Sequence, residues 1–272
     1  MTGISEPAVT VLIESSTASG SNLSNQTNII LPPNGGGGQI TTTPFLMNFD
    51  QTLGTRPAND DTGARSMSYV SFGLTPQLIV SDFKFGTGAL TSPDAPALNL
   101  SSANLESEIT TDLDCGGLTD YCMQGWIKLQ AFFFADGTSK VHRVVDFAGT
   151  SLIELIAVRL SDTTYNLRLL VITPTSTDMQ TGSTVFNTGT YYETAISKIA
   201  NAFVLRVDGT TEASVNPGSN ELAVIGYQVQ LFSFEHTMTI FDSMRVVRGC
   251  GVFNADYTAL TSALGQITSC PI

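Results

Sequence analysis

Closely spaced carboxylates are the residues of this sequence with the clearest potential for catalysis. Glu106 and Glu108 stand two residues apart, and so do Asp112 and Asp114. Residues two apart on a β-strand share a face, and a glycoside hydrolase needs two carboxylates about 5–9 Å apart. The two pairs therefore define a hydrolase hypothesis.

The same region could instead bind a cation. Five acids and no Lys or Arg lie between residues 106 and 120. Hard oxygen ligands at close spacing can hold calcium, but the stretch lacks the Asp at positions 1, 3 and 5 and the Gly at position 6 of an EF-hand loop. We therefore predict a solvated acidic loop here.

Histidine and cysteine offer little nucleophilic chemistry. A Ser-His-Asp or Cys-His catalyst would have to use His142 or His236, and neither lies near G-x-S-x-G or another nucleophile motif. We predict that both are surface or rim histidines. The four cysteines lack the paired C-x-x-C spacing of a zinc site. Cys115 and Cys122 flank the sequence GGLTDY and could close as a disulfide in oxidising conditions, or could be ordinary reduced thiols.

These side chains must be positioned mainly by β-strands. From Phe45 onward, short alternating runs are each closed by Gly, Pro, Asn or Asp, which is typical of an all-β sandwich. Asp136-Gly137 and Asp208-Gly209 lie between such runs, where a turn needs residues that tolerate positive φ. The one stretch with helical potential is 192–200. The expected strands cover residues 45–49, 78–85, 125–134, 141–147, 153–160, 165–172, 203–207, 223–234 and 238–247.

Residues 1–44 differ in kind from the domain expected at 45–272. Strand-like islands at 9–13 and 29–31 are separated by Ser/Asn/Thr-rich sequence, and Pro32-Pro33 precedes four glycines. We interpret this segment as an extended N-terminal arm with a hinge, which pairs with the main domain, another copy or a larger assembly; a disordered tail is the alternative. The arm has no Lys or Arg, so it should dock on protein.

The amino-acid composition limits the classes of partner that the protein is expected to bind. Charged residues are 13%, hydrophobic residues 42%, and the net charge is −12, which predicts a folded protein with a neutral polar surface. Too few cations are present for a nucleic-acid footprint or for an anionic membrane surface. Other proteins, neutral sugars and divalent cations are the expected partners.

The sequence also predicts neither a signal peptide nor a membrane-spanning segment. The N-terminus lacks a basic start followed by an apolar core, and no apolar run reaches the roughly 18 residues of a membrane span. We therefore expect a protein made in a cytoplasm without a signal peptide, which leaves by lysis or on a particle.

Several segments, in order, resemble the LamG-like, concanavalin A-type jelly-roll modules of bacteriophage virion proteins. The longest match is FDSMRVVRGCGVFNADY, which is similar to the family's "I-D-D-V-R-I-T-K-G" strand and its continuation, although Ser243 replaces the second Asp. The family's "W-H-H-V-A" strand is also replaced, by residues 190–198. The other matching segments are FLMNFD at 45–50 leading to DDTG at 60–63, FKFGTGAL at 83–90, MQGWIK at 123–128 and FVLRVDG at 203–209.

The resemblance covers residues 45–260 and implies a jelly-roll sandwich of two antiparallel sheets. It places calcium beside Asp50, with a second oxygen from Asp242; the alternative is that both carboxylates cap turns. It places Trp126 on a central strand, which favours core packing over sugar stacking. Tyr191 and Tyr192, in the segment that departs from the family, are then the better candidates for contacts with a carbohydrate or partner.

These observations lead to a non-enzymatic virion structural protein as the first hypothesis. The jelly roll would be displayed on the head or tail of the phage, anchored to other virion proteins through residues 1–44. The second hypothesis is an adhesin or tail-fibre module that binds a host surface glycan. A glycoside hydrolase ranks third, because the three-acid strand motif of the related hydrolases is absent. The resemblance also implies a homo-oligomer.

Overall fold

The computed structural model describes most of the predicted domain. The first described strand begins at Thr42, three residues before the predicted boundary, whereas residues 1–41 lie outside the described part, so the arm stays a prediction. Within the described part, no helix is long and apolar enough to cross a membrane. The described residues are 42–50, 61–63, 66–71, 77–79, 82–91, 103–113, 115, 120–132, 137–146, 148–199, 201–218, 222, 226–231, 237–249 and 255–267.

The first of two antiparallel sheets contains both the earliest and the latest described strands of the chain. β1 pairs with β16 beside the main path of the sheet, and β6 lies at its centre, between β12 and β16. In order, the strands are β14 (Thr210–Val215), β13 (Ala202–Val207), β12 (Tyr191–Ile199), β6 (Tyr121–Phe132), β16 (Thr237–Arg248), β4 (Ala89–Thr91) and β3 (Gln77–Ile79), with β1 (Thr42–Met47) paired to β16.

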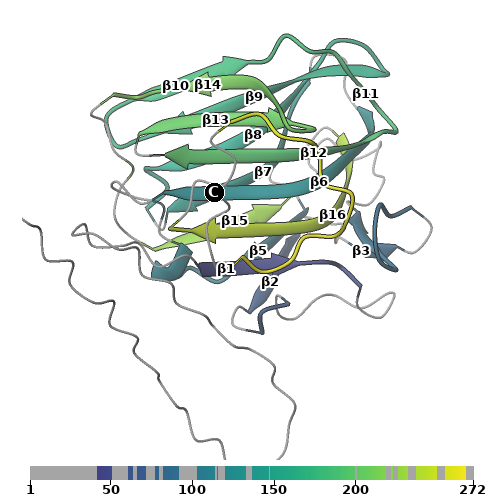
Figure 1. The fold of residues 1–272 in the computed structure, drawn as a ribbon, viewed down its shortest axis with the longest axis horizontal. Helices are drawn as coiled ribbons and strands as arrows, with labels where there is room; N and C mark the ends of the chain where they lie inside the picture. Colours follow the sequence, from purple (N-terminus) through teal and green to yellow (C-terminus); the bar gives the residue numbers. More distant parts are fainter. Residues whose placement is uncertain are drawn as a thin grey trace, which may run out of the picture.

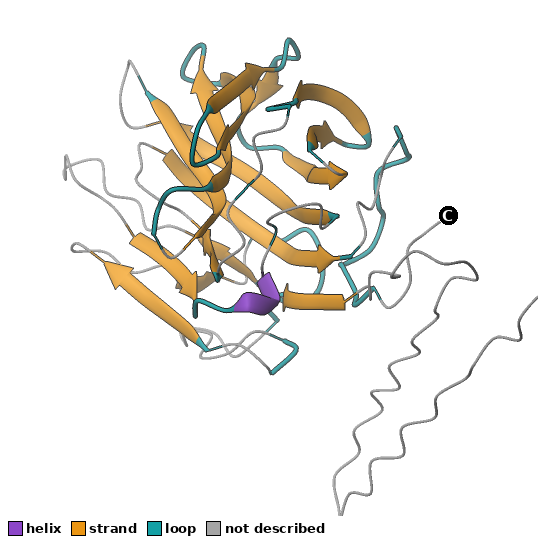
Figure 2. Cartoon of the chain, turned by 90° about the vertical axis from the view of Figure 1, so that its left-hand side faces the viewer, coloured by secondary structure: helices purple, strands orange, loops and turns teal. Residues whose placement is uncertain are grey.

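The second sheet stacks on the first, so the predicted all-β jelly-roll sandwich is confirmed (Figure 1). Figure 2 shows the layers from the side, with the short 3₁₀ helix η1 (Thr111–Leu113) in purple. In order, the strands of the second sheet are β10 (Thr177–Thr181), β9 (Thr164–Ile172), β8 (Leu152–Arg159), β7 (Thr138–Asp146), β15 (Tyr227–Leu231), β5 (Ala103–Ser107) and β2 (Met67–Ser71), with β11 (Phe186–Asn187) paired to β9.

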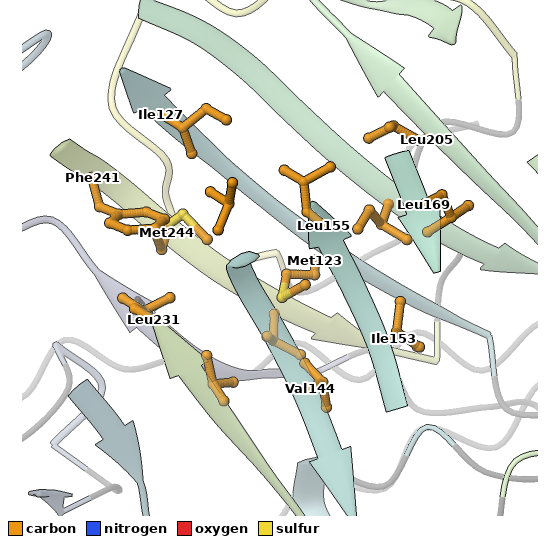
Figure 3. Packing of buried hydrophobic residues seen from close by; sticks show 14 of the residues in the cluster. Met123, Ile127, Val144, Ile153, Leu155, Leu169, Leu205, Leu231, Phe241 and Met244 are labelled. Atoms are coloured by element: carbon orange, nitrogen blue, oxygen red, sulfur yellow. The ribbon is translucent and has the colours of Figure 1, made fainter. Parts of the chain in front are cut away.

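The core lies between the sheets and follows from the two-residue period of the strands. Alternate residues of β9 are buried, and the residues between them lie on the outer face. Figure 3 shows Met123 and Ile127 of the first sheet packed against Ile153, Leu155 and Leu169 of the second. Burial of each such side chain is worth about 1.5–3 kcal/mol. The core therefore fixes which side chains of every strand point outward.

The stretch with helical potential, 192–200, does not form a helix over its described residues, which belong to β12. The segment is a strand that pairs with β6 on one side and with β13 on the other. Pairing on both sides satisfies its main-chain groups and outweighs its modest helical potential. The predicted turn that follows β13 is confirmed, because Asp208 and Gly209 both have positive φ, at 47° and 81°.

A C-terminal strap, residues 255–267, crosses the outer face of the first sheet (Figure 1, the yellow trace in front of β12, β6 and β16). The Tyr257 N–H donates to the Gly209 carbonyl at 2.9 Å, which fixes one end of the strap on the β13–β14 turn. At the other end, the Ile267 N–H donates to Oγ1 of Thr43 in β1 at 2.7 Å. The strap thus joins strands at opposite sides of the sheet.

A buried polar network lies under the middle of the strap. Tyr257 donates its hydroxyl to Oε1 of Glu193 at 2.9 Å, and the Leu260 N–H donates to Oε2 at 2.7 Å. Gln124 also donates to Glu193, while Arg245 donates to Oε1 of Gln124 at 2.5 and 2.9 Å. Glu193 and Gln124 are fully buried. The strap therefore closes a set of hydrogen bonds that the sheet alone leaves open.

Candidate functional site

The outer face of the second sheet carries a continuous row of directly opposed residues, which we call the central row. The cross-strand register aligns one outward residue from each of seven neighbouring strands. Five members are polar or charged, and the two at the β10 edge are apolar. From β2 to β10 the central row consists of Ser68, Glu106, Gln230, Arg143, Glu154, Leu170 and Met179.

Arg143 is the geometric centre of this row. Its Nε donates to Oε1 of Gln230 at 2.5 Å, and its Nη1 lies 3.8 Å from Oε1 of Glu154. Glu154 is only 2% exposed, and burial raises the pKa of its carboxyl, although Lys140 and Arg143 act in the opposite direction. Oε1 of Glu154 accepts no hydrogen bond. The guanidinium is thus held in place by neighbours on both sides.

A second outward row runs beside the central row. The register aligns Lys140 of β7, Ile156 of β8, Arg168 of β9 and Thr181 of β10. Arg168 donates from Nε to Oγ1 of Thr181 at 2.8 Å. Together the two rows mix hydrogen-bonding groups with aliphatic surface, which is the combination that ligand sites use.

The predicted contact residues Tyr191 and Tyr192 lie on opposite faces of β12 and are only half-exposed. The Tyr191 hydroxyl donates to the main-chain carbonyl of Asp82 at 2.9 Å, and the Lys128 ammonium lies 5.2 Å from the centre of its ring. Tyr192 points toward the core and packs edge-on against Phe186, with ring centres 5.0 Å apart. The structure therefore gives each ring a packing role and does not bring the two together in one site.

The predicted calcium residues Asp50 and Asp242 do come together around one turn. Oδ2 of Asp242 accepts the N–H groups of Lys84 and Phe85, while Oδ1 of Asp50 accepts the N–H of Thr87 at 2.5 Å. A Cβ on Gly86 would lie 2.0 Å from Oδ1 of Asp50, so glycine is required there. The alternative role, capping a turn, is what these contacts provide.

Two observations bear on whether this turn fits calcium. Oδ1 of Asp242 is buried and accepts no hydrogen bond, so one hard oxygen is available. Calcium takes 6–8 oxygen ligands, and no group of three or more His, Cys, Asp or Glu suited to a metal occurs among the described residues. Asp50 and Asp242 would be the protein carboxylates of such a site, and calcium there stays a prediction.

Trp126 is buried, as predicted, but not in the core between the sheets. It lies on the outer face of β6, where Phe85 packs edge-on against it at 5.3 Å between ring centres. The Lys84 ammonium lies 4.8 Å from the ring centre. The turn that contains Lys84 and Phe85 therefore covers the indole, which removes it as a sugar-stacking surface.

The carboxylate pairs of the hydrolase hypothesis do not form a site on one strand. Glu106 lies on β5, but that strand ends at Ser107, so Glu108 lies beyond it, where its N–H donates to the Ser66 carbonyl. Asp112 lies in η1 rather than on a strand, and Asp114 lies outside the described residues.

His142 corrects the prediction of a surface histidine. It is 1% exposed and packs against Phe241 in the core, with ring centres 6.3 Å apart. The β7–β8 register shifts between Lys140 and His142, and this bulge turns His142 inward although Lys140 points outward. His236 lies outside the described residues.

Cys115 and Cys122 are not joined by a disulfide in the structure, which corresponds to the alternative of two reduced thiols. Cys115 packs in the core between the sheets, whereas Cys122 belongs to a separate cluster with Ala195 and Val247. Those two residues lie on the outer face of the first sheet, under the strap. Side chains on opposite faces of a sheet cannot meet the close geometry of a disulfide.

We expect both buried thiols to resist alkylation in the native protein. Burial raises the pKa of Cys122 to about 11, and the thiolate is the reactive form. Iodoacetamide labelling followed by peptide mapping should modify Cys115 and Cys122 only after denaturation in guanidinium. Rapid labelling of either cysteine under native conditions would contradict this arrangement.

The stacked antiparallel sheets define a β-sandwich of the jelly-roll class. No family model matches the sequence, and no curated protein is similar to it. Solved structures do share the fold. Domain 4 of AbnA, a GH43 extracellular arabinanase from Geobacillus stearothermophilus in complex with arabinotriose, matches with a TM-score of 0.55 and 14% identity, over 77% of this chain and 94% of that chain.

The botulinum neurotoxin serotype D binding domain matches with a TM-score of 0.51 and 10% identity, over 79% of this chain and 48% of that chain. The protein thus spans about half the length of the toxin domain. At these identities the likeness establishes the shared sandwich fold.

Proposed function

We propose that this domain is a non-catalytic carbohydrate-binding module whose ligand lies across the outer face of the second sheet. The central row is the observation that carries the proposal. It places the Arg143 guanidinium, which the buried Gln230 and Glu154 hold on either side, between Glu106 and the aliphatic side chains of Leu170 and Met179. A sugar ring has hydroxyl groups at its edge and C–H groups on its faces, so it can use both parts of such a surface.

The shared fold supports the same proposal. The match to domain 4 of the arabinanase covers nearly all of that domain, which was solved with a bound oligosaccharide. The neutral polar surface that the composition predicts is also suited to sugars, because hydroxyl and amide groups exchange hydrogen bonds with them at little desolvation cost.

The spacing of the acids favours binding over hydrolysis. Glu106 and Glu154 both point outward in the central row, but Gln230 and Arg143 lie between them on β15 and β7. Three steps between strands separate them by about 14 Å, whereas glycosidase carboxylates lie about 5–9.5 Å apart. These two acids are therefore too far apart to act as an acid and a nucleophile.

Display on a phage particle is part of the same proposal and rests on the sequence resemblance to virion modules. In that setting the domain would be a structural component of the head or tail that presents the second sheet outward, with residues 1–44 as its anchor. Loss of incorporation into particles after deletion of residues 1–41 would support the anchor, and unchanged incorporation would contradict it.

Glycan binding should depend on the centre of the row. Replacement of Arg143 with methionine keeps the aliphatic stem but removes a charged donor worth about 1.5–3 kcal/mol. We expect affinity for a glycan identified on an array to fall about tenfold or more, measured by isothermal titration calorimetry.

Two further variants control this experiment. Arg159→Met makes the same change at a hairpin, where Arg159 pairs with Asp162 away from the rows, and should leave affinity unchanged. Met179 is 57% exposed, so Met179→Ala tests the apolar end of the row with little risk to folding and should weaken binding severalfold. A wild-type domain that binds no glycan on a broad array would overturn the proposed function.

A further inference from the structure

The strap binds the first sheet as a separate peptide would. Residues 255–267 form no strand, and their main-chain groups bind side chains that project from the sheet. The Leu264 N–H donates to Oγ of Ser243 at 2.7 Å, and Nη1 of Arg245 donates to the Gly265 carbonyl at 2.8 Å. The contacts of the strap with β12 and β1 that are described above are of the same kind. Hydrogen bonds to the main chain give a surface affinity for a peptide.

The β13–β14 turn is shaped to receive the first residues of the strap. A Cβ on Gly209 would lie 1.8 Å from the Tyr257 carbonyl oxygen, so the absence of a side chain there makes room for the peptide main chain. Next to it, Oδ1 of Asp256 accepts the N–H and the hydroxyl of Thr211 at 3.1 and 2.6 Å, and lies 3.4 Å from Nε of Arg206. The turn therefore recognises an acidic residue that is followed by a close main-chain contact.

Two further side chains of the strap add selectivity. The Tyr257 hydroxyl donates to the buried carboxylate of Glu193 at 2.9 Å, and Leu264 is itself buried against the sheet. The surface thus matches the pattern Asp-Tyr-x-x-Leu-x-x-x-Leu of residues 256–264, in which Leu260 contributes its N–H to Glu193. Every copy of the chain carries this pattern.

The strap can leave the sheet without breaking any strand pairing. It follows β16, the last described strand, and its own residues belong to no strand. Leu264 is its one buried residue, so opening exposes little apolar surface. Segments with few buried side chains open at a lower free energy than the whole domain. Water then replaces the strap donors at Glu193, so the carboxylate keeps hydrogen-bond partners in the open state.

We propose that the outer face of the first sheet is a peptide-binding surface through which two copies of the chain exchange straps. In the exchanged pair, Tyr257 of one copy donates to Glu193 of the other, and the reverse. A second copy is the occupant because its residues 255–267 make every contact described above, and exchange of an identical element costs little. The saccharide proposed above lies on the other sheet, so either proposal can fail without the other.

Two cysteines report opening of the strap in the full-length chain. Cys122 belongs to the cluster against which Tyr257 and Ile267 pack, whereas Cys115 lies in the core between the sheets. Tyr257→Phe removes a hydrogen bond to a charged group, so iodoacetamide should label Cys122 at least about tenfold faster than in the wild type, with Cys115 unchanged. Tyr191→Phe, which removes a hydroxyl from the same sheet outside the strap, should change neither rate. An unchanged rate at Cys122 in Tyr257→Phe would overturn the proposal.

Disulfide trapping between full-length chains tests the exchange itself. The Ile267 N–H lies 2.7 Å from Oγ1 of Thr43, so cysteines at these two positions can form a disulfide. A tagged Thr43→Cys chain and an untagged Ile267→Cys chain, both carrying Cys250→Ser and Cys270→Ser, are incubated together at high concentration and oxidised. We expect a disulfide-linked heterodimer on a non-reducing gel, with a yield that rises with protein concentration.

A matched pair controls for random collisions. Ser262 is exposed in the middle of the strap, away from Thr43, so Ser262→Cys in place of Ile267→Cys should give little heterodimer. A heterodimer from the first pair alone supports strap exchange. No heterodimer, or an equal yield from the two pairs, would overturn the proposal, and the strap would then be a fixed cover of its own sheet.

Discussion

Replacement of Glu193 with alanine is expected to lower the free energy of unfolding by about 3–5 kcal/mol, because it removes one partner from a buried charged network. The Glu193 carboxylate is fully buried and accepts from Gln124, from the Tyr257 hydroxyl and from the Leu260 N–H. Alanine would leave these donors and the nearby Arg245 charge without compensation. Urea denaturation followed by circular dichroism gives the free energy directly.

Two control variants distinguish the loss of this hydrogen-bond network from the general effect of removing a charge. Glu193→Gln keeps an acceptor oxygen and the side-chain length, so it should cost less than Glu193→Ala. Asp162→Ala also removes an acid, but one that is 86% exposed in its ion pair with Arg159, and it should change stability by less than about 1 kcal/mol. A loss below about 1 kcal/mol for Glu193→Ala would contradict the structural role of the strap.

The second large expected effect is a loss of stability in acid caused by His142. Burial lowers the pKa of His142 from 6.5 to about 3, and neither ring nitrogen has a hydrogen-bond partner. Below pH 6.5 the unfolded chain therefore binds a proton that the folded domain excludes. The stabilisation is complete above pH 6.5 and is lost as the pH falls toward 3. At pH 5 the expected loss is about 2 kcal/mol.

His142→Leu isolates this contribution. Leucine should raise the free energy of unfolding at pH 7 by about 1–3 kcal/mol, because two buried polar atoms without partners are removed. It should also abolish the His142 part of the pH dependence, which urea denaturation at pH 7, 6 and 5 measures. The idea fails if the wild type and His142→Leu lose the same free energy between pH 7 and pH 5.

Protonation of Asp242 has the opposite effect on stability over part of this pH range. Burial raises the pKa of Asp242 from 3.8 to about 6, and the nearby Asp50 charge adds to the rise, although the N–H groups of Phe85 and Lys84 oppose it. The folded domain therefore binds this proton more tightly than the unfolded chain, which adds stability as the pH falls from 6 to 3.8. Comparison of Asp242→Asn with the wild type would separate the two titrations.

The sequence predicts most of the sandwich because its strands alternate strongly. The run expected at 165–172 is β9 with one residue added at its start, and the Asp208-Gly209 turn forms as expected. Local signals of this kind depend on neighbours in the chain, so one sequence contains them. Asp50 and Asp242 are far apart in the chain, so local signals do not predict that they meet at one turn. Only the family resemblance predicts it.

Local sequence signals do not predict side-chain positions that depend on strand register or on segments far away in the chain. Simple alternation places His142 on the same face as Lys140, and one extra residue in the β7 bulge reverses that assignment. Trp126 points away from the core between the sheets, but a turn at residues 82–88 covers it there, so the indole is buried on an outer face. The central row combines residues from seven strands, so no window of the sequence contains it.

The pairing of β1 with β16 has a consequence for synthesis of the protein. Phe45 lies opposite Val246, so roughly 200 residues must be translated after β1 before its partner strand exists, which takes about 10–40 s at about 5–20 residues per second. During that time Phe45, Leu46 and Met47 lack the strand beside which they are buried in the finished domain. We therefore expect the nascent chain to rely on ribosome-associated chaperones, and the strap to seal the first sheet only as its last residues leave the exit tunnel.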